Sequence, residues 1–367
     1  MKFHCCKNPL KSGDIDEERL LRVIGYSYCL EREGVDDSAE KNFVSILGNF
    51  LNMIDLSGAN LQGIDLSRAS LEKATLTNAN LSRSNLTETD LRCSDLTYAN
   101  LNGADLSKAK LGGAVLVDAE LVGANLSNVN LSSDPTKMHE KAPNLAGINL
   151  DSAILTGAVM NGASLGTATL TNLNLSNFNL QKVDFGNANL SFTTFASADL
   201  QDATFSEQNA ESDTNDSGEA NEVLALDNER FIRTDFNHSN LKNANFEGVN
   251  LEFVNFTCAR MCNVNFRNSI LDNAILINAE LIDADLNGAS LSNAILTGAN
   301  LSNANLQNAL LSDSILVGVN FSGANLEGTY LGGSDLSNAD LSDADLSRTN
   351  TKDVIFNQNT RWPRCRL

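Results

Sequence analysis

The stretch SNADLSDADLS, residues 337–347, carries a leucine at every fifth position, and this spacing decides the fold. Ala339 and Ala344 each stand two residues before one of these leucines, with an aspartate in between. In a helix, five residues advance about 140° beyond a full turn, so successive leucines would spiral around the axis. In a plain strand, an odd period would send them to opposite faces. The spacing therefore predicts a backbone that turns in every repeat, with Ala and Leu pointing inward from a very short extended piece.

The same five-residue pattern extends over most of the chain. Its central residues form three arrays of 16, 12 and 24 members, which run from Leu56 to Leu131, from Leu150 to Phe205 and from Phe231 to Leu346. All 52 centres are Leu, Phe or Met, and Ala occupies 30 of the positions two residues earlier. Chance does not produce this regularity, so the centres and the small residues before them are predicted to form the core.

The repeats ANLSR (79–83), ADLSK (104–108) and ADLSD (339–343) share an A-(D/N)-L-x-x pattern that resembles the pentapeptide-repeat proteins. The resemblance implies an all-β solenoid, a right-handed quadrilateral β-helix with four pentapeptides per coil, and so about 13 coils for the 52 centres. Residues 20 apart should then stack, which adds aromatic contacts to the apolar burial. The expected pairs are Phe236 with Phe256, Phe246 with Phe266, and Phe185 with Phe205.

Residues 1–51 precede the arrays and are predicted to form a small N-terminal helical cap. Apolar residues recur at helical spacing in 14–34 and 38–51. A solenoid end exposes apolar surface and needs a cover, which favours a cap over the alternative of a partner-binding module.

The β-helix itself is predicted over 52–360, with two insertions and a C-terminal tail at 361–367. The first insertion, 132–144, contains two prolines, and Leu145 after it is a candidate start of a degenerate extra repeat. The second insertion, 206–229, carries eight acids and no Lys or Arg. Its composition leaves little apolar surface to bury, so it is expected to be largely disordered.

The sequence shows no constellation of residues that would carry catalysis. The histidines His4, His139 and His238 lie in three different regions, and no zinc-protease helix, phosphate-binding loop, nucleophile elbow or paired-cysteine zinc site is present. The repeat places its acids and serines on outer walls, where burial does not raise a carboxylate pKa. Neither enzymatic activity nor a bound metal or cofactor is therefore expected.

The cysteines and the terminal sequence bear on the compartment. Seven cysteines, an odd number without CxxC spacing, predict reduced thiols rather than a disulfide framework. The chain shows no signal-peptide pattern and no apolar run long enough to cross a membrane. A cytoplasmic location is the expectation, although a cryptic export signal of a bacterial effector would escape this reasoning.

Charge is the remaining signal, because the formal net charge is −20 and disfavours direct binding to nucleic acid or to an anionic membrane. Residues 268–347 contain ten acids and no Lys or Arg. With four pentapeptides per coil, seven of the ten fall on two adjacent walls: Glu280, Asp283, Asp340 and Asp343 on one, and Asp285, Glu327 and Asp345 on the next. They form either a solvated face that keeps the protein soluble or an acidic docking surface for a basic partner.

The leading functional hypothesis is a non-enzymatic protein–protein interaction scaffold that presents flat acidic walls and loops to a protein partner. The competing hypothesis is DNA mimicry, because the resemblance includes the fluoroquinolone-resistance proteins, which look like acidic duplex DNA and bind DNA gyrase or topoisomerase IV. This chain is longer than those proteins, and no helix resembling their dimerisation helix follows Phe356. A secreted bacterial effector is a third possibility. The identity of the partner and the oligomeric state are left open.

Overall fold

The computed structural model of the protein describes residues 51–132, 143–205, 231 and 233–363. The predicted helical cap, except Leu51, and the acidic insertion 206–229 lie outside these residues. The described residues divide into two compact units. Unit 1 contains residues 51–131, 143–144 and 153–158, and unit 2 contains residues 132, 145–152, 159–205, 231 and 233–363.

Every pentapeptide makes one tight turn. In the repeat centred on Leu296, the N–H of Ala299 donates to the carbonyl of Leu296 at 2.9 Å, which closes a four-residue turn. The third residue of this turn, Gly298, has a φ of 70°. Glycine adopts that left-handed conformation without cost, and Asn and Asp tolerate it better than other residues. The frequent Gly, Asn and Asp two residues after each centre therefore have a backbone cause.

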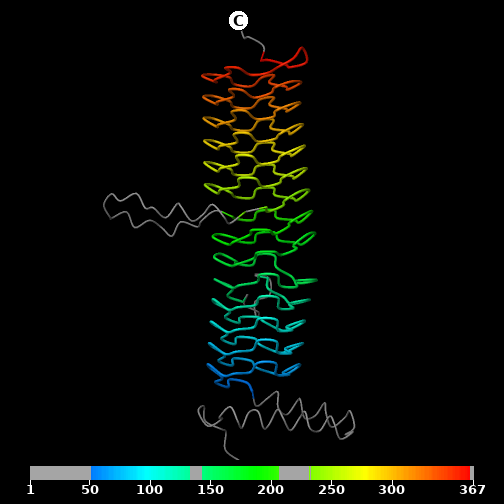
Figure 1. The fold of residues 1–367 in the computed structure, drawn as a ribbon, viewed down its shortest axis with the longest axis vertical. Coiled ribbons are helices and arrows are strands. Elements are labelled where there is room, and N and C mark those ends of the chain that lie inside the picture. Colours follow the sequence, from blue (N-terminus) through cyan, green and yellow to red (C-terminus); the bar gives the residue numbers. More distant parts are fainter. Residues whose placement is uncertain (1–50, 133–142, 206–230, 232, 364–367) are drawn as a thin grey trace, which may run out of the picture. The chain divides into compact units, whose positions relative to one another are not determined.

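Successive coils are joined by isolated parallel bridges, each one residue long, and the described part of the chain contains neither a helix nor a longer strand. Glu280 pairs with Asn300 in this way: the N–H of Leu281 donates to the Asn300 carbonyl at 2.7 Å, and the N–H of Asn300 donates to the Ala279 carbonyl at 2.9 Å. Through most of each unit, bridge partners are separated along the chain by the same interval as Glu280 and Asn300, so four pentapeptides make one coil. Figure 1 shows these coils stacked within each unit.

The core of each unit consists of the central residues and the small residues that precede them. Leu291 and Ala294, for example, have no exposed surface. The three expected aromatic stacks are confirmed, with centroid separations and interplanar angles of 5.2 Å and 8° for Phe236–Phe256, 5.2 Å and 21° for Phe246–Phe266, and 4.9 Å and 13° for Phe185–Phe205. Where Ser or Thr replaces Ala, its hydroxyl usually bonds to a carbonyl inside the coil, as Ser314 Oγ does to the Leu291 carbonyl at 2.7 Å.

In unit 1, the bridges continue beyond residues 133–142 through a coil that is longer than the others. Val115 pairs with Asn144, whereas the regular interval would end at position 135, and the N–H of Asn144 donates to the Ala114 carbonyl at 2.8 Å. The predicted insertion 132–144 is therefore too long at its C-terminal end, because Asn144 is already part of the repeat. Leu145 is only 1% exposed and is the extra centre that the sequence indicated. Leu51 is also buried at a centre position, so the repeat begins before residue 52.

Unit 2 has four columns of outward bridge residues, each of which we call a ladder and name after one member. The Glu280 ladder is Asn179, Asp199, Asn240, Arg260, Glu280, Asn300, Asn320, Asp340 and Arg361. The Asp285 ladder is Ser164, Asp184, Thr204, Asn245, Asn265, Asp285, Asn305, Asn325 and Asp345.

The other two ladders of unit 2 precede these along each coil. The Ile270 ladder is Asn250, Ile270, Ser290, Leu310, Tyr330 and Asn350, and a separate short run of bridges earlier in unit 2 is Asn149, Thr169 and Asn189. The Ile275 ladder is Asn174, Thr194, Asp235, Asn255, Ile275, Ile295, Ile315, Asp335 and Ile355. Because the chain passes the four ladders in the order Ile270, Ile275, Glu280, Asp285, the Ile270 and Ile275 ladders are neighbours, and so are the other two.

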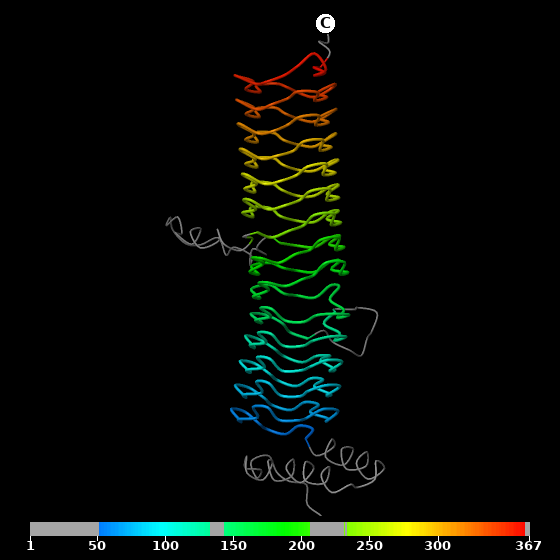
Figure 2. The same ribbon diagram turned by 45° about the vertical axis from the view of Figure 1, so that its right-hand side comes forward.

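The last coil of unit 2 is slightly irregular (red in Figure 2). Asp340 pairs with Arg361 instead of the residue at position 360, so the repeat extends past the predicted boundary at 360. Phe356 occupies the centre position directly after the rung Ile355 but is 58% exposed. Its ring meets Trp362 edge-on, with centroids 5.6 Å apart. An apolar end of the coil is thus only partly covered among the described residues.

Candidate functional site

The acidic residues singled out by the sequence gather along the Glu280 and Asp285 ladders of unit 2, which we call the acidic walls. Glu280 and Asp340 are rungs of the first ladder, and Asp285 and Asp345 are rungs of the second. In the first ladder two asparagine rungs, Asn300 and Asn320, separate the two acids.

Three of the seven acids lie at the corners of the coil, not on the flat walls. Asp283 and Asp343 occupy the left-handed turn position between the two acidic ladders, with φ of 57° and 58°. Glu327 follows the Asp285 ladder, at its corner with the Ile270 ladder. The structure therefore places two groups of three acids along one shared corner, Glu280, Asp283 and Asp285 in one coil and Asp340, Asp343 and Asp345 three coils further on. Glu327 lies at the far edge of the second wall.

Arginines from outside the cation-free stretch pair with four of the seven acids. Arg260 lies 3.5 Å from Glu280, and Arg267 lies 3.1 Å from Asp285. At the other end of the stretch, Arg361 lies 3.1 Å from Asp340 and Arg348 lies 3.8 Å from Glu327. The sequence count of acids without cations overstates the free charge of these walls. Within the described residues, Asp283, Asp343 and Asp345 form no ion pair.

The aspartate rungs of these walls also have a structural role, because Asp285, Asp340 and Asp345 each accept a hydrogen bond from the turn that follows. Asp340 Oδ1 accepts the N–H of Ser342 at 3.0 Å, and Asp345 Oδ1 accepts the N–H of Ser347 at 2.9 Å. Asparagine rungs do the same, as Asn320 Oδ1 does with the N–H of Ser322 at 3.0 Å. Such side-chain caps of turns explain why Asp and Asn alternate freely at this position.

These hydrogen bonds favour the ionised form of two wall carboxylates. The side chain and then the backbone N–H of Ser342, together with Arg361, hold the pKa of Asp340 below its ordinary value. The side chain and N–H of Ser347 likewise lower the pKa of Asp345. Asp340 and Asp345 therefore stay ionised in neutral and mildly acidic media.

Side-chain amides link the rungs of the Asp285 ladder along its length. Asn325 Nδ2 donates to Asn305 Oδ1 at 3.3 Å, and Asn305 Nδ2 donates to Asp285 Oδ1 at 3.0 Å. The wall is thus a fixed array of acceptors and charges on a rigid backbone. Such an array can bind a complementary surface, and it offers no buried acid, base or nucleophile for chemistry.

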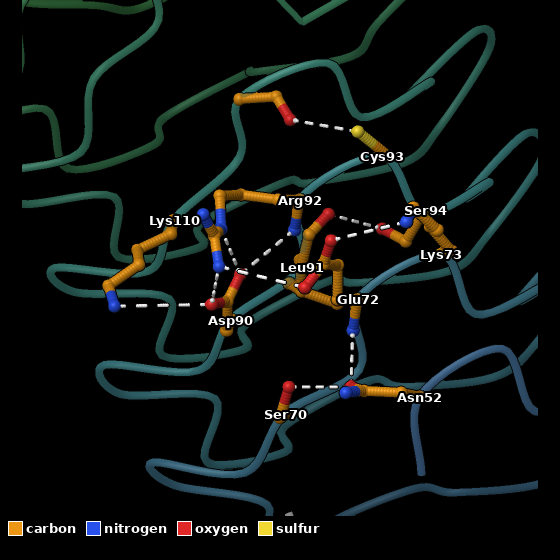
Figure 3. Close-up of polar contacts among 11 residues, drawn as sticks. Asn52, Ser70, Glu72, Lys73, Asp90, Leu91, Arg92, Cys93, Ser94 and Lys110 are labelled. Atoms are coloured by element: carbon orange, nitrogen blue, oxygen red, sulfur yellow. Dashed lines mark hydrogen bonds and ion pairs between the residues drawn. The ribbon is translucent and has the colours of Figure 1, made fainter. Parts of the chain in front are cut away.

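Unit 1 contains a cluster of charges that are paired with one another. Figure 3 shows Arg92 donating through Nε and Nη2 to both oxygens of Asp90, at 2.8 and 2.7 Å. Glu72 lies 3.7 Å from Arg92, and Lys110 lies 3.9 Å from Asp90. Partial burial alone would raise the pKa of Asp90, but the hydrogen bonds and charge of Arg92, with Lys110, lower it overall. Asp90 and Glu72 are thus paired, whereas Asp95, Asp105 and Asp118 of the same unit form no ion pair within the described residues.

Sequence reasoning missed the apolar character of the other two ladders. Ile275, Ile295 and Ile315 stand on three successive rungs, and the neighbouring ladder carries Ile270 and Leu310. The signal was present, because reading every twentieth residue at the outward position reveals both columns.

Other kinds of site are not found among the described residues. No group of three His, Cys, Asp or Glu side chains in this part of the chain could hold a metal ion. The model has no helix, within the ranges it describes, with the length and apolar character of a membrane span. Cys93, Cys258 and Cys262 are free thiols.

A protein-family model described as pentapeptide repeats matches more than half of the chain. The matched residues are 54–92, 94–132, 142–172, 168–206, 230–268, 274–313 and 314–350. No curated protein sequence matches the chain significantly.

Several solved structures of repeat proteins are similar to this chain. HetL, a pentapeptide repeat protein involved in heterocyst differentiation regulation from the cyanobacterium Nostoc sp. strain PCC 7120, is 27% identical, with 83% of this chain and 86% of HetL covered and a TM-score of 0.18. Rfr23 from the cyanobacterium Cyanothece 51142 is 38% identical, with 29% and 63% covered and a TM-score of 0.17. QnrB1, a plasmid-mediated fluoroquinolone resistance protein, is 16% identical, with 65% and 94% covered and a TM-score of 0.20. At such low TM-scores these likenesses carry no argument about partners.

Proposed function

Because the chain belongs to the pentapeptide-repeat family, we propose that it is a non-enzymatic interaction scaffold whose acidic walls bind a protein with a basic surface. One observation carries the proposal: two groups of three acids lie along the same corner of unit 2, three coils apart. Three of these acids, Asp283, Asp343 and Asp345, have no ion pair within the described residues. A lysine- or arginine-rich patch of a partner would complement these three charges. The rigid bridges between coils hold the acids in place before binding, which lowers the entropic cost of association.

The proposal also covers the architecture of the whole chain. We expect a right-handed quadrilateral β-helix of about 13 coils, because the sequence has 52 centres and each coil takes four. We also expect the residues before Leu51 to form a helical cap. Family membership supports the β-helix. A circular dichroism spectrum with mainly β structure and a minor helical part is the expected result, and a dominantly helical spectrum would refute it.

The acid spacing favours a scaffold over a mimic of DNA. Glu280 and Asp340 are three rungs apart, which is about 14 Å at the usual spacing of neighbouring strands. Duplex DNA carries one charge per roughly 1.7 Å of its axis. Both of these acids also form ion pairs with arginines. The wall therefore has far fewer unpaired charges than a phosphate backbone.

The test is affinity capture from a lysate of the source organism at about 50 and 500 mM salt, with the captured proteins identified by mass spectrometry. The acidic-wall variant is Asp283→Asn, Asp343→Asn, Asp345→Asn. Its asparagine at position 345 can still accept the hydrogen bond of the turn, and asparagine tolerates the left-handed φ at positions 283 and 343. The control variant Asp95→Asn, Asp105→Asn, Asp118→Asn removes the same number of charges from unit 1, at two rungs and one left-handed turn position.

We expect the wild type and the control to capture the same basic proteins at low salt, and the acidic-wall variant to lose them. High salt should release them, because exposed charges are screened within about a Debye length. Equal capture by all three proteins would refute the proposal. DNA mimicry is tested separately by gyrase supercoiling, where inhibition by the wild type but not by the acidic-wall variant would favour the mimic.

A further inference from the structure

The side of unit 2 formed by the Ile270 and Ile275 ladders is apolar over several coils. Ile275, Ile295 and Ile315 follow one another on successive rungs, and Ile355 continues the column after Asp335. Exposed fractions on this side reach 43% for Ile315, 47% for Leu310 and 56% for Ile355. We call this side, made of Ile270, Ile275, Ile295, Leu310, Ile315, Tyr330 and Ile355, the apolar face.

The two ladders merge into one surface through Tyr330. A Cβ added at Gly332, on the corner between the ladders, would lie 2.7 Å from the Tyr330 ring. The ring therefore extends from its own ladder over the glycine toward the Ile275 ladder. An alanine at residue 332 would displace it.

The apolar face has a structural cost. An isoleucine on a rung has no side-chain acceptor, so it forgoes the turn-capping bond that Asn255, in the same ladder, makes with the N–H of Thr257 at 3.0 Å. Phe253, at the corner between the two apolar ladders, is 63% exposed and has a φ of 63°. This conformation is rare for a bulky residue. Exposed apolar columns on parallel bridges also invite aggregation. Folding alone gives no reason to keep these side chains on the surface.

We propose that the apolar face binds an amphipathic, basic α-helical segment of a protein partner. A helix brings apolar side chains to one side every three to four residues, with about 5.4 Å per turn. Rungs are spaced by about 4.8 Å, so a helix aligned with the Ile275 ladder advances by about one rung per turn. It meets an isoleucine at every rung of the column except Asp335. The column from Ile275 to Ile355 spans four rungs, or about 19 Å, which about 13 helical residues cover.

Charge around the apolar face selects a basic partner over a second copy of this chain. Asp313 lies at the corner between the two ladders, and Asp335 interrupts the isoleucine column itself. Asp272 and Asp353 also lie at this corner. Asp272 Oδ1 accepts hydrogen bonds from the Ser290 hydroxyl and the Ser292 N–H, and the carboxylate of Asp353 lies 3.8 Å from the ammonium group of Lys352. Residues 268–347 contain no Lys or Arg. A second copy would bring its own acids against these, whereas lysines flanking an apolar helix stripe would pair with them.

The probe for this inference is a labelled peptide of Leu and Lys, about five helical turns long, with Leu at helical spacing, and its control is the same composition in scrambled order. Fluorescence anisotropy with the full chain measures both affinities at about 150 and 500 mM salt. The apolar-face variant is Ile275→Asn, Ile295→Asn, Ile315→Asn. Asparagine is the native residue at rung 255, so this variant gains turn caps and keeps the fold, which its melting temperature verifies.

We expect the wild type to bind the amphipathic peptide at least tenfold more tightly than the scrambled one, with most of this preference kept at high salt. The apolar-face variant should lose the preference. The variant Asp313→Asn, Asp335→Asn should weaken binding only at low salt. At about 500 mM salt, where the charges of the acidic walls are screened, the acidic-wall variant should bind like the wild type, so failure of this inference and failure of the proposed function are distinguishable.

Three results would overturn the inference. One is equal affinity of the wild type and the apolar-face variant, and another is equal affinity for the two peptides. The third is a wild-type dimer in sedimentation velocity that the apolar-face variant dissociates, because the face would then be covered by a second copy.

Discussion

The rings of Phe205 and Phe246 stack with centroids 4.3 Å apart and planes 7° apart, although the whole segment 206–229 lies between them in the chain. Elsewhere in unit 2 such partners are separated by one regular coil, as Phe236 and Phe256 are. The segment after Phe205 thus lengthens one coil without changing which side chains face inward.

This register makes the effect of a deletion predictable. Removal of residues 207–227 restores the ordinary repeat length, because it places Phe231 at the next centre position after Phe205. We expect a melting temperature close to that of the wild type. The slightly longer deletion of residues 206–228 leaves too few residues between Phe205 and Phe231 to form the turn. It should therefore lower the melting temperature markedly. Equal melting of the two deletions would contradict the continuous register.

Truncation of a central residue should be far more costly than truncation of its neighbour in the turn. Leu291 has no exposed surface, so Leu291→Ala should destabilise the protein by about 3–5 kcal/mol through lost burial and a cavity. Ser292 is partly exposed, and Ser292→Ala should change stability by only about 0.5 kcal/mol. Urea unfolding followed by circular dichroism measures both, and similar midpoints would contradict the inward orientation of the centres.

A buried hydroxyl in unit 1 offers a stabilising substitution. Ser84 is 2% exposed, and its Oγ has no hydrogen-bond partner among the described residues. Ser84→Ala should raise the free energy of unfolding by about 1 kcal/mol, because it removes an unsatisfied polar group. Ser94 is the matched control, since its Oγ donates to the Leu91 carbonyl at 2.7 Å. Ser94→Ala should lower stability by about 1 kcal/mol, and a loss in both variants would show that Ser84 is bonded in solution.

Acid should destabilise the last coils of unit 2 through Asp340. Its pKa in the folded protein is lowered, first by the side chain of Ser342, then by the Ser342 N–H and by Arg361. The ionised carboxylate thus stabilises the fold fully above the unfolded pKa of about 3.9. That contribution is lost as the pH falls through the lowered folded pKa. Asp340→Asn cannot titrate, so its melting temperature should fall less steeply below about pH 4. Parallel slopes from pH 2 to 7 would refute the coupling.

The sequence by itself determined the period and the core, and its resemblance to the repeat family supplied the size of a coil. A large apolar side chain at every fifth position, with a small side chain two positions before it, defines which residues point inward. This holds for any turn that connects the repeats. The stacking of every fourth pentapeptide then predicted three phenylalanine pairs correctly, because partners in a regular solenoid depend only on their separation along the chain.

Only the tertiary structure decided which acids are free and how the ladders differ. Arg260 lies one regular coil before Glu280, but Arg267 precedes Asp285 by less than a coil and Arg361 follows Asp340 by more than one. A long guanidinium side chain and an irregular last coil bring these pairs together, so a count of charges along the chain misses them. The point where the repeat resumes at Asn144 was likewise decided by its backbone bonds to Ala114 and Leu116. Local spacing specifies what faces inward, but contacts between coils depend on side-chain reach and on irregular turns, which only the folded chain brings into contact.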